Sequence, residues 1–405
     1  MKLVKNKRWM LLLLAIPSVV FAQKQERQMD TTYYKALIPE AKQGLLKNVS
    51  VIANMNFAFR NEFEDGEYTQ SRFRNEQFRL EIRGQVHKNV YFRFRDRYTR
   101  AQTSESIDNL SRSVDLAYLR FDLNPKFSIS VGKMCADWGA WEFDWNPIDI
   151  YEYSDIVEYA DNFLTGVGFS YTPNNRNQFT FQVLDSRTKS FDELYGTQPN
   201  FTESKAPLAF VGNWRGSLLN GKIKTIWSYS LFNEAQDANG DAANMNYIAL
   251  GNEFIVSDKF SFIYDFKWSL EDLDRTTVVS ETVPDAIYAY SLANTEYIGH
   301  WLHLRYKITP KVHFTFVGML DVANWKNATS TDAANNPDGE TKIRDAWGYI
   351  PAVEYFPWSD LNLKFFANWV GRDYKYTDYA KTRMSAADYS TGRFTIGFIT
   401  PLGVL

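Results

Sequence analysis

Arginine is concentrated in one short part of this 405-residue sequence. Eight arginines lie between positions 71 and 100. A guanidinium stays charged at every physiological pH, and its planar fork of N–H groups binds carboxylates and phosphates through paired hydrogen bonds. A row of arginines along one surface would therefore attract anions.

The opposite charge is concentrated further along. The stretch CADWGAWEFDWNPIDIYEYSD runs from Cys135 to Asp155, and the whole segment 135–161 has eight acidic residues, seven aromatic residues and no basic residue. It follows no helical or strand period. An acidic composition is typical of an ordinary solvated loop, but the three tryptophans of this segment need a surface to pack against.

Most of the remaining chain alternates polar and apolar side chains, which predicts β-strands. In 260–268, for example, five aromatic residues face away from Ser261, Asp265 and Lys267. The same alternation predicts that three adjacent strands present six arginines on one polar face, as an arginine ladder: Arg79, Arg83, Arg93, Arg95, Arg97 and Arg120.

The alternative is that these arginines pair with polar-face carboxylates or lie on a solvated face. Alternation places Glu81 and Asp122 on the same face as the ladder. Two carboxylates cannot neutralise six guanidiniums, so we expect the ladder to keep a positive charge.

The connections between the strands predict the architecture. Seven short turns alternate with eight longer polar linkers, the first near 62–71 and the third at 135–161, which gives sixteen strands. In an up-and-down barrel every second connection lies on the same rim, so one rim can have tight turns and the other long loops. A soluble sandwich would mix its connection lengths, and a propeller would repeat a blade motif. The sequence therefore predicts an all-β fold, a transmembrane antiparallel β-barrel, with a bulge at Pro351 inside one strand.

The N-terminus predicts export. Residues 1–22 combine a basic start with an apolar run of signal-peptide length. The alternative, a membrane anchor, needs roughly 20 apolar residues, and the run is shorter. Residues 23–47 lack alternation, so we expect a periplasmic leader there and an outer-membrane barrel over 48–405.

Composition agrees with a barrel in lipid. Aromatic residues make up 16% of the chain and charged residues 23%, with a negative mean hydropathy. Transmembrane barrels combine aromatic girdles with polar interiors. The formal net charge of -3 argues against a generally basic, nucleic-acid-binding protein, and a single cysteine excludes a disulfide framework.

We expect the acidic segment to be an inward-folded third loop that sets the diameter of the barrel interior. Sixteen strands would otherwise enclose a wide water-filled space. Trp138, Trp141 and Trp145 would anchor the loop. Some of its carboxylates would then face the arginine ladder across a narrow slit, and the candidates are Asp137, Glu142, Asp144 and Asp149.

The stretch ISVGKMCADWGAWEFDWNPIDIYEYSD, from Ile129 to Asp155, resembles the strand and third loop of the phosphate-selective porin O/P family of Gram-negative outer membranes. The resemblance implies a sixteen-stranded barrel, usually a homotrimer, whose pore captures anions on rows of basic side chains. The chain matches these rows by strand position at Arg93, Arg95, Arg97 and Arg120. It departs from the family at the loop, which has no basic residue.

Other function classes have less support. The four histidines, His87, His300, His303 and His313, accompany no catalytic or metal-ligand grouping, so we expect no enzyme activity, cofactor or metal. Two alternatives to a channel for small hydrophilic solutes or anions remain open: an adhesive or structural barrel with a plugged interior, and a secreted glycan-binding β protein.

We also expect outer-membrane lipid and further copies of the chain as partners. Alternation directs four charges of the second and third strands outward, which favours a homo-oligomer, a trimer, with its contact there: Arg74, Glu76, Asp96 and Arg100.

Overall fold

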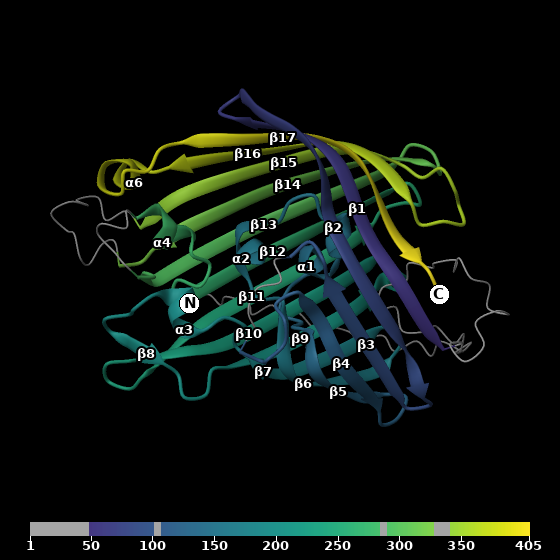
Figure 1. The fold of residues 1–405 in the computed structure, drawn as a ribbon, viewed down its shortest axis with the longest axis horizontal. Helices are drawn as coiled ribbons and strands as arrows, with labels where there is room; N and C mark the ends of the chain where they lie inside the picture. The colour runs from purple at the N-terminus through teal and green to yellow at the C-terminus, as the bar shows by residue number, and fades with distance from the viewer. Residues whose placement is uncertain (1–47, 101–106, 284–289, 328–340) are drawn as a thin grey trace, which may run out of the picture. The chain divides into compact units, whose positions relative to one another are not determined.

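The computed structural model describes residues 48–100, 107–283, 290–327 and 341–405. Within these residues, seventeen strands form one antiparallel sheet (Figure 1). Sixteen of them close into a ring, because β1 pairs with both β2 and β17. The remaining strand, β8, is three residues long and pairs with β10 beside β9. The prediction of a closed sixteen-stranded antiparallel barrel is confirmed.

The first half of the ring and the additional strand comprise β1 (Val49–Glu64), β2 (Glu67–His87), β3 (Val90–Arg97), β4 (Val114–Asp122), β5 (Phe127–Cys135), β6 (Phe163–Asn174), β7 (Asn177–Asp185), β8 (Phe201–Glu203) and β9 (Leu208–Leu218). The second half comprises β10 (Ile223–Asp237), β11 (Ala242–Ile255), β12 (Phe260–Leu273), β13 (Ala293–Lys307), β14 (Val312–Trp325), β15 (Lys342–Tyr355), β16 (Lys364–Tyr376) and β17 (Tyr389–Gly403).

Short helices lie in the connections. Three of them belong to the connection between β5 and β6: α1 (Trp141–Asp144), η3 (Pro147–Asp149) and α2 (Asp155–Tyr159). The others are α3 (Phe191–Tyr195), η4 (Leu219–Gly221), α4 (Val278–Thr282) and α6 (Asp378–Arg383). Among the described residues, no helix is both long and apolar enough to cross a membrane.

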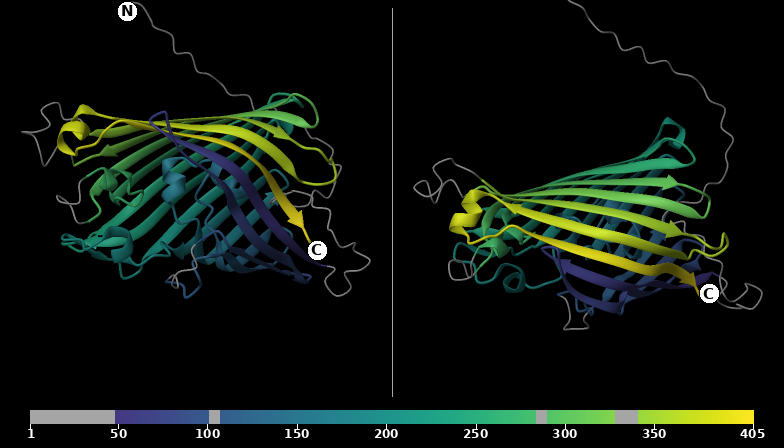
Figure 2. Two further views of the ribbon diagram at one scale, coloured as in Figure 1. Left: turned by 45° about the horizontal axis from the view of Figure 1, so that its top comes forward. Right: turned by 90° about the horizontal axis from the view of Figure 1, so that it is seen from above.

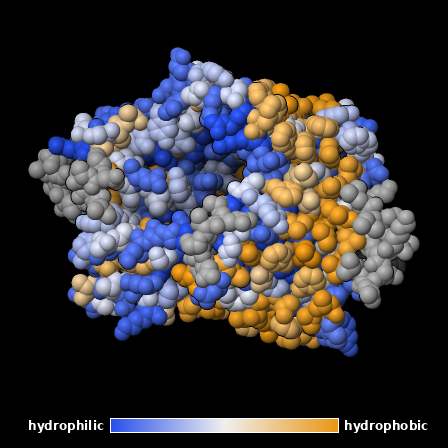
Figure 3. All heavy atoms as spheres, viewed as in Figure 1, coloured by the Kyte–Doolittle hydropathy of each residue, from blue (hydrophilic) through white to orange (hydrophobic). Residues whose placement is uncertain are grey.

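The alternation predicted for the strands is clear in β12. Ser261, Asp265 and Lys267 are buried, whereas the aromatic residues between them are partly exposed. In a closed ring the buried face of each strand is the inner one, and the outer face carries exposed aromatic side chains. Figure 3 shows apolar side chains gathered over β1 to β4 beside a hollow with polar side chains. Closure of the ring lets the backbone of every ring strand form hydrogen bonds with two neighbouring strands. Strands in hydrocarbon need this pairing, because no water is there to bind their N–H and C=O groups.

Within the described residues, several of the long connections lie at one end of the ring. Helices α3, α4 and α6 lie at this end, and the C-terminus lies at the other (Figures 1 and 2). The prediction of a first long linker at 62–71 is wrong. Here β1 and β2 continue to a tight turn at Asp65 and Gly66, whose φ values of 49° and 83° fit a two-residue hairpin turn. The Asp-Gly pair was the signal for this turn.

The bulge predicted at Pro351 is also wrong. Pro351 pairs with Phe316 of β14 in an unshifted register. On its other side, the pairing of β15 with β16 omits Ile350 and Pro351 and then resumes in the same register. The missing N–H therefore interrupts one ladder locally without adding a residue to the strand. The predicted signal peptide (1–22) and leader (23–47) lie outside the described residues.

Candidate functional site

The six predicted arginines lie on β2, β3 and β4, and each is held by a carboxylate. Glu81 lies 3.5 Å from Arg83, and it binds Arg93 through two hydrogen bonds of 3.0 and 3.2 Å. On β4, Arg120 pairs with Asp122 at 3.1 Å and lies over the ring of Tyr91. The ladder is thus a set of ion pairs.

The other three arginines converge on one carboxylate that the sequence did not reveal. Asp115 lies 3.3 Å from Arg79, 3.3 Å from Arg95 and 2.8 Å from Arg97. Its side chain is fully buried. Simple alternation along β4 would place Asp115 on the outer face with Leu119 and was therefore misleading.

A β-bulge explains the position of Asp115. In the pairing of β3 with β4, Arg95 lies opposite Leu116 and Asp96 lies opposite Val114, so Asp115 is the extra residue. A bulge re-aims a side chain and shifts the alternation beyond it. Bulges leave no mark in a polar–apolar pattern, which is why Asp115 was missed.

The ladder keeps a positive charge. Its six guanidiniums are paired with three carboxylates, Glu81, Asp115 and Asp122, which leaves three formal positive charges in this set of nine side chains. The expectation of a net positive ladder thus agrees with the geometry, although three carboxylates hold the ladder where two were expected.

The acidic connection between β5 and β6 lies against other strands. Arg215 of β9 lies 3.4 Å from Asp137 and 2.7 Å from Asp144. Buried Lys267 of β12 pairs with Glu142, whose carboxylate also accepts hydrogen bonds of 2.6 and 2.7 Å from the backbone and hydroxyl of Ser154. Glu142 therefore closes the connection on itself and ties it to β12.

The second half of the connection is held by the last strands of the chain. Asp149 pairs with Lys364 of β16 at 2.9 Å. Asp155 pairs with Arg344 of β15 and, at 3.0 Å, with Arg372 of β16. These basic residues are far from the connection in the sequence, and only the closed ring brings them to it.

Aromatic side chains of the connection pack on the same strands. Trp138 is 1% exposed, and its ring lies 4.9 Å from that of Tyr247 on β11. Trp145 lies 4.6 Å from the ring of His303 on β13. These contacts match the expectation that the tryptophans need a packing surface, and they assign His303 to that surface.

The loop carboxylates predicted to face the ladder form their ion pairs with other strands, and their opposition to the ladder across a slit stays a prediction. Within the described part of the chain, the ion pairs of Asp137, Glu142, Asp144 and Asp149 are with Arg215, Lys267 and Lys364. These partners belong to β9, β12 and β16, whereas the ladder belongs to β2 to β4. A buried carboxylate needs a close cation, and the cations of β9 to β16 are the ones that the loop reaches.

Tyr153 is a residue of the loop that lies near the ladder. Burial raises the pKa of its phenol, and the charges of Arg79 and Arg97 oppose that rise. The loop thus places a tyrosine near the ladder, whereas its carboxylates are anchored elsewhere.

The outward direction predicted for Arg74 and Glu76 is also wrong. The pairing of β1 with β2 skips Glu76, so a second bulge shifts the alternation there. Glu76 pairs with Arg60 at 2.6 Å, and Arg74 lies opposite buried Ala58 on the inner face. Phe73, which is 71% exposed, takes the outer face instead.

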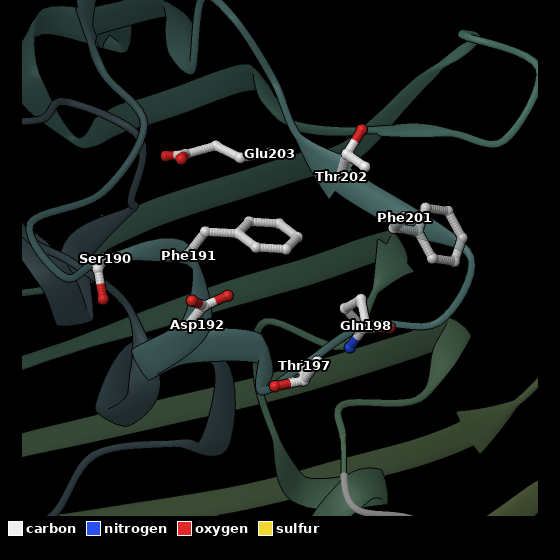
Figure 4. A pocket seen from close by; sticks show the side chains of 8 residues that line it. All are labelled: Ser190, Phe191, Asp192, Thr197, Gln198, Phe201, Thr202 and Glu203. Carbon is white, nitrogen blue, oxygen red and sulfur yellow. The ribbon is translucent and has the colours of Figure 1, made fainter.

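A pocket of about 310 Å³ lies in the connection between β7 and β9 (Figure 4). Phe191, Asp192, Phe201 and Glu203 are among its lining residues. None of the residues predicted from the sequence lines it. In the described residues, no three His, Cys, Asp or Glu side chains come together as a metal site.

Solved structures with the same fold are outer-membrane proteins. The outer membrane channel DcaP of Acinetobacter baumannii matches with a TM-score of 0.57 and 11% identity, over 86% of this chain and 96% of that chain. An anion-selective porin from Comamonas acidovorans matches with a TM-score of 0.53 and 10% identity, over 87% and 98%. OmpT of Vibrio cholerae matches with a TM-score of 0.52 and 10% identity, over 87% and 97%. At these identities the likeness concerns the fold alone.

Among curated proteins, no sequence matches this chain. The family model described as phosphate-selective porin O and P matches residues 51–399, which begin in β1, end in β17 and include every ring strand between them. The chain therefore belongs to the phosphate-selective porin O and P family.

Proposed function

We propose that this barrel is an outer-membrane porin through which small hydrophilic solutes diffuse passively, with a preference for anions. The observation that carries the preference is the uneven distribution of charge. The ladder on β2 to β4 keeps three formal positive charges, whereas the loop carboxylates are paired with cations of other strands.

The connection between β5 and β6 is proposed to lie inside the barrel and to narrow it. It contacts inner-face residues of several strands, from Asn54 and Asn56 of β1 to Lys267 of β12 and Lys364 of β16. A segment that lies inside the ring can contact the inner faces of this many strands. The open path would then run between this segment and the arginine ladder.

Such a path would favour anions by electrostatics. Charges of one sign along a narrow passage with low-dielectric walls raise the local concentration of counter-ions. The guanidiniums that flank the path are partly exposed, with side-chain exposures of 20% for Arg83, 22% for Arg97 and 18% for Arg120. They can therefore act on ions in water.

The preference is tested by replacing Arg93, Arg95 and Arg97 with glutamine. The reversal potential of single channels in a salt gradient should move toward cations, because three positive charges leave the path. The control replaces two exposed arginines of the connections, Arg176 and Arg383, and should leave the potential unchanged. An unchanged potential in the triple variant would show that these arginines do not govern ion selection.

The narrowing is tested by a deletion within 137–155. A variant that still assembles should conduct markedly more than the parent, because an unobstructed ring of sixteen strands encloses a wide aqueous space. Equal conductance would place the segment outside the path. A parent barrel without conductance would favour the adhesive or structural alternative.

Export and assembly complete the proposal. The signal peptide at 1–22 would direct the chain across the inner membrane, and the leader at 23–47 would remain in the periplasm. We infer a homo-oligomer for the assembled porin and no catalytic activity. With Arg74 and Glu76 on the inner face, the outer surface near β2 offers exposed Phe73 for a contact between copies.

A further inference from the structure

We infer that Asp115 sets the anion affinity of the arginine ladder, by occupying three guanidiniums as a built-in counter-anion. This inference rests on the proposed anion path and adds a property to it. The ladder would attract anions through its net charge without holding them tightly.

The first evidence is the geometry around Asp115. Its carboxylate lies within 3.3 Å of Arg79 and Arg95 and within 2.8 Å of Arg97. A carboxylate offers about four lone-pair positions. Arg97 donates a hydrogen bond to one of its oxygens, and the guanidiniums of Arg79 and Arg95 lie within ion-pair distance of the other, so three guanidiniums surround this carboxylate as they would surround a bound anion.

The second evidence is the bulge that aims this side chain. Asp115 is the unpaired residue of this bulge in β4, and the bulge turns its side chain from the outer face to the ladder. A bulge disrupts the ladder of backbone hydrogen bonds locally, and barrels use bulges where a side chain must be re-aimed. The strand thus contains a feature whose structural result is a carboxylate among the arginines.

The third evidence is that carboxylates also hold two further arginines of the ladder, Arg93 and Arg120. Glu81 accepts two hydrogen bonds of 3.0 and 3.2 Å from the guanidinium of Arg93. Asp122 accepts two hydrogen bonds of 3.1 and 3.3 Å from the guanidinium of Arg120. An entering phosphate would have to displace one of these carboxylates to gain the same paired contacts with Arg93 or Arg120, so it would exchange quickly.

The size of the effect follows from the charge that Asp115 removes. Replacing it with asparagine raises the formal charge of the ladder and its carboxylates by one. One charge at about 6 Å in water changes the affinity for a monovalent anion roughly threefold and for a divalent anion roughly tenfold.

The experiment measures the block of single-channel chloride current by inorganic phosphate. In Asp115→Asn the half-blocking phosphate concentration should fall roughly tenfold relative to the parent. The control, Asp241→Asn, removes an exposed carboxylate of the connection between β10 and β11 and should leave the concentration unchanged.

A second pair of variants avoids leaving buried Arg79 without its carboxylate. Arg79→Gln is compared with Arg79→Gln/Asp115→Asn, and the double variant should again need roughly tenfold less phosphate. A merely structural role would disturb conductance without increasing phosphate affinity. This pair decides the question where Asp115→Asn alone does not assemble.

Two results would have different meanings. A parent channel without anion preference would overturn the proposed anion path and this inference with it. A parent channel with anion preference, but with the same phosphate block in the presence and absence of Asp115, would overturn the inference alone.

Discussion

Replacing Glu142 with glutamine should loosen the connection between β5 and β6 at its most buried anchor. Glu142 and Lys267 are each 1% exposed at their side chains and form an ion pair. Glutamine keeps the shape and one oxygen, which can accept one of the two Ser154 hydrogen bonds, but it leaves the Lys267 charge without this partner. Breaking one side of a buried ion pair costs about 3–5 kcal/mol.

The expected loss lies near the lower end of that range, about 3 kcal/mol. Two features reduce it: glutamine can still accept one of the two hydrogen bonds of Ser154, and the Ser154 hydroxyl also accepts a bond from Lys267. Replacing Lys267 with methionine as well should restore about 2 kcal/mol, because removing both charges of a buried pair is often close to neutral.

The assay is urea unfolding in detergent, followed by the difference in gel mobility between the folded and the heat-denatured barrel. The matched control is Asp345→Asn, which breaks the partly exposed pair with Lys342 at 2.9 Å and should cost less than about 1 kcal/mol. In bilayers, Glu142→Gln should also give noisier single-channel current, since the loosened segment borders the proposed path.

Two results would refute this reasoning. The first is a loss of stability in Glu142→Gln no larger than in Asp345→Asn, because the pair would then not be a buried anchor. The second is a double variant as unstable as the single one, because the uncompensated charge of Lys267 would then not be the cause.

Two further predictions concern backbone geometry and pH. Gly66 and Gly132 both have positive φ, but a Cβ at Gly66 meets open space, whereas one at Gly132 would lie 2.4 Å from a backbone oxygen. Gly66→Ala should therefore cost about 1 kcal/mol, and Gly132→Ala should cost clearly more in the same unfolding assay; equal costs would contradict the close contact. Glu193 of α3 bonds Arg112 at 2.5 and 2.6 Å, and these bonds hold the pKa of its carboxyl below the usual value. The stabilisation that these bonds provide is complete above the ordinary glutamate pKa of about 4.3 and is lost as the pH falls below it. Spin labels on the two connections should therefore move apart in acid. Glu193→Gln should move them apart at neutral pH.

The number of strands could be predicted because alternation is a local property. The polar and apolar faces of 260–268 are those found in β12. The prediction failed at 62–71, where two strands continue to the turn at Asp65 and Gly66. A polar stretch was there interpreted as a loop, although it contains Phe63 and Tyr68, which pair across the two strands.

The faces of single residues could be predicted only between bulges. Glu76 and Asp115 are each the extra residue of a bulge, and each reverses the alternation beyond it. A bulge depends on the pairing of two strands, which one strand's sequence does not record. The predicted faces of Arg74 and Glu76 were therefore wrong, and Asp115, the third carboxylate of the ladder, was not predicted.

The partners of the acidic connection could not be predicted, because they depend on closure of the ring. Lys267, Lys364 and Arg372 lie more than a hundred residues beyond Glu142 in the sequence. Alternation identified Lys267 as a residue of the polar face, but no local pattern links it to Glu142. The tryptophans gave the usable signal, since they showed that the connection needed a surface.

The pairing of the loop carboxylates with other strands affects the electrostatics of the proposed path. Carboxylates of the loop facing the arginines would have produced a field across the path, with cations and anions drawn to opposite sides. Their pairing with Arg215, Lys267 and Lys364 instead holds them at the anchors and leaves one formal negative charge among these four carboxylates and three cations. The ladder then acts on the path through its own balance of six guanidiniums and three carboxylates. Because a carboxylate within that set removes charge next to the path, changes at Glu81, Asp115 or Asp122 should alter ion preference more than changes at the acidic residues of the loop.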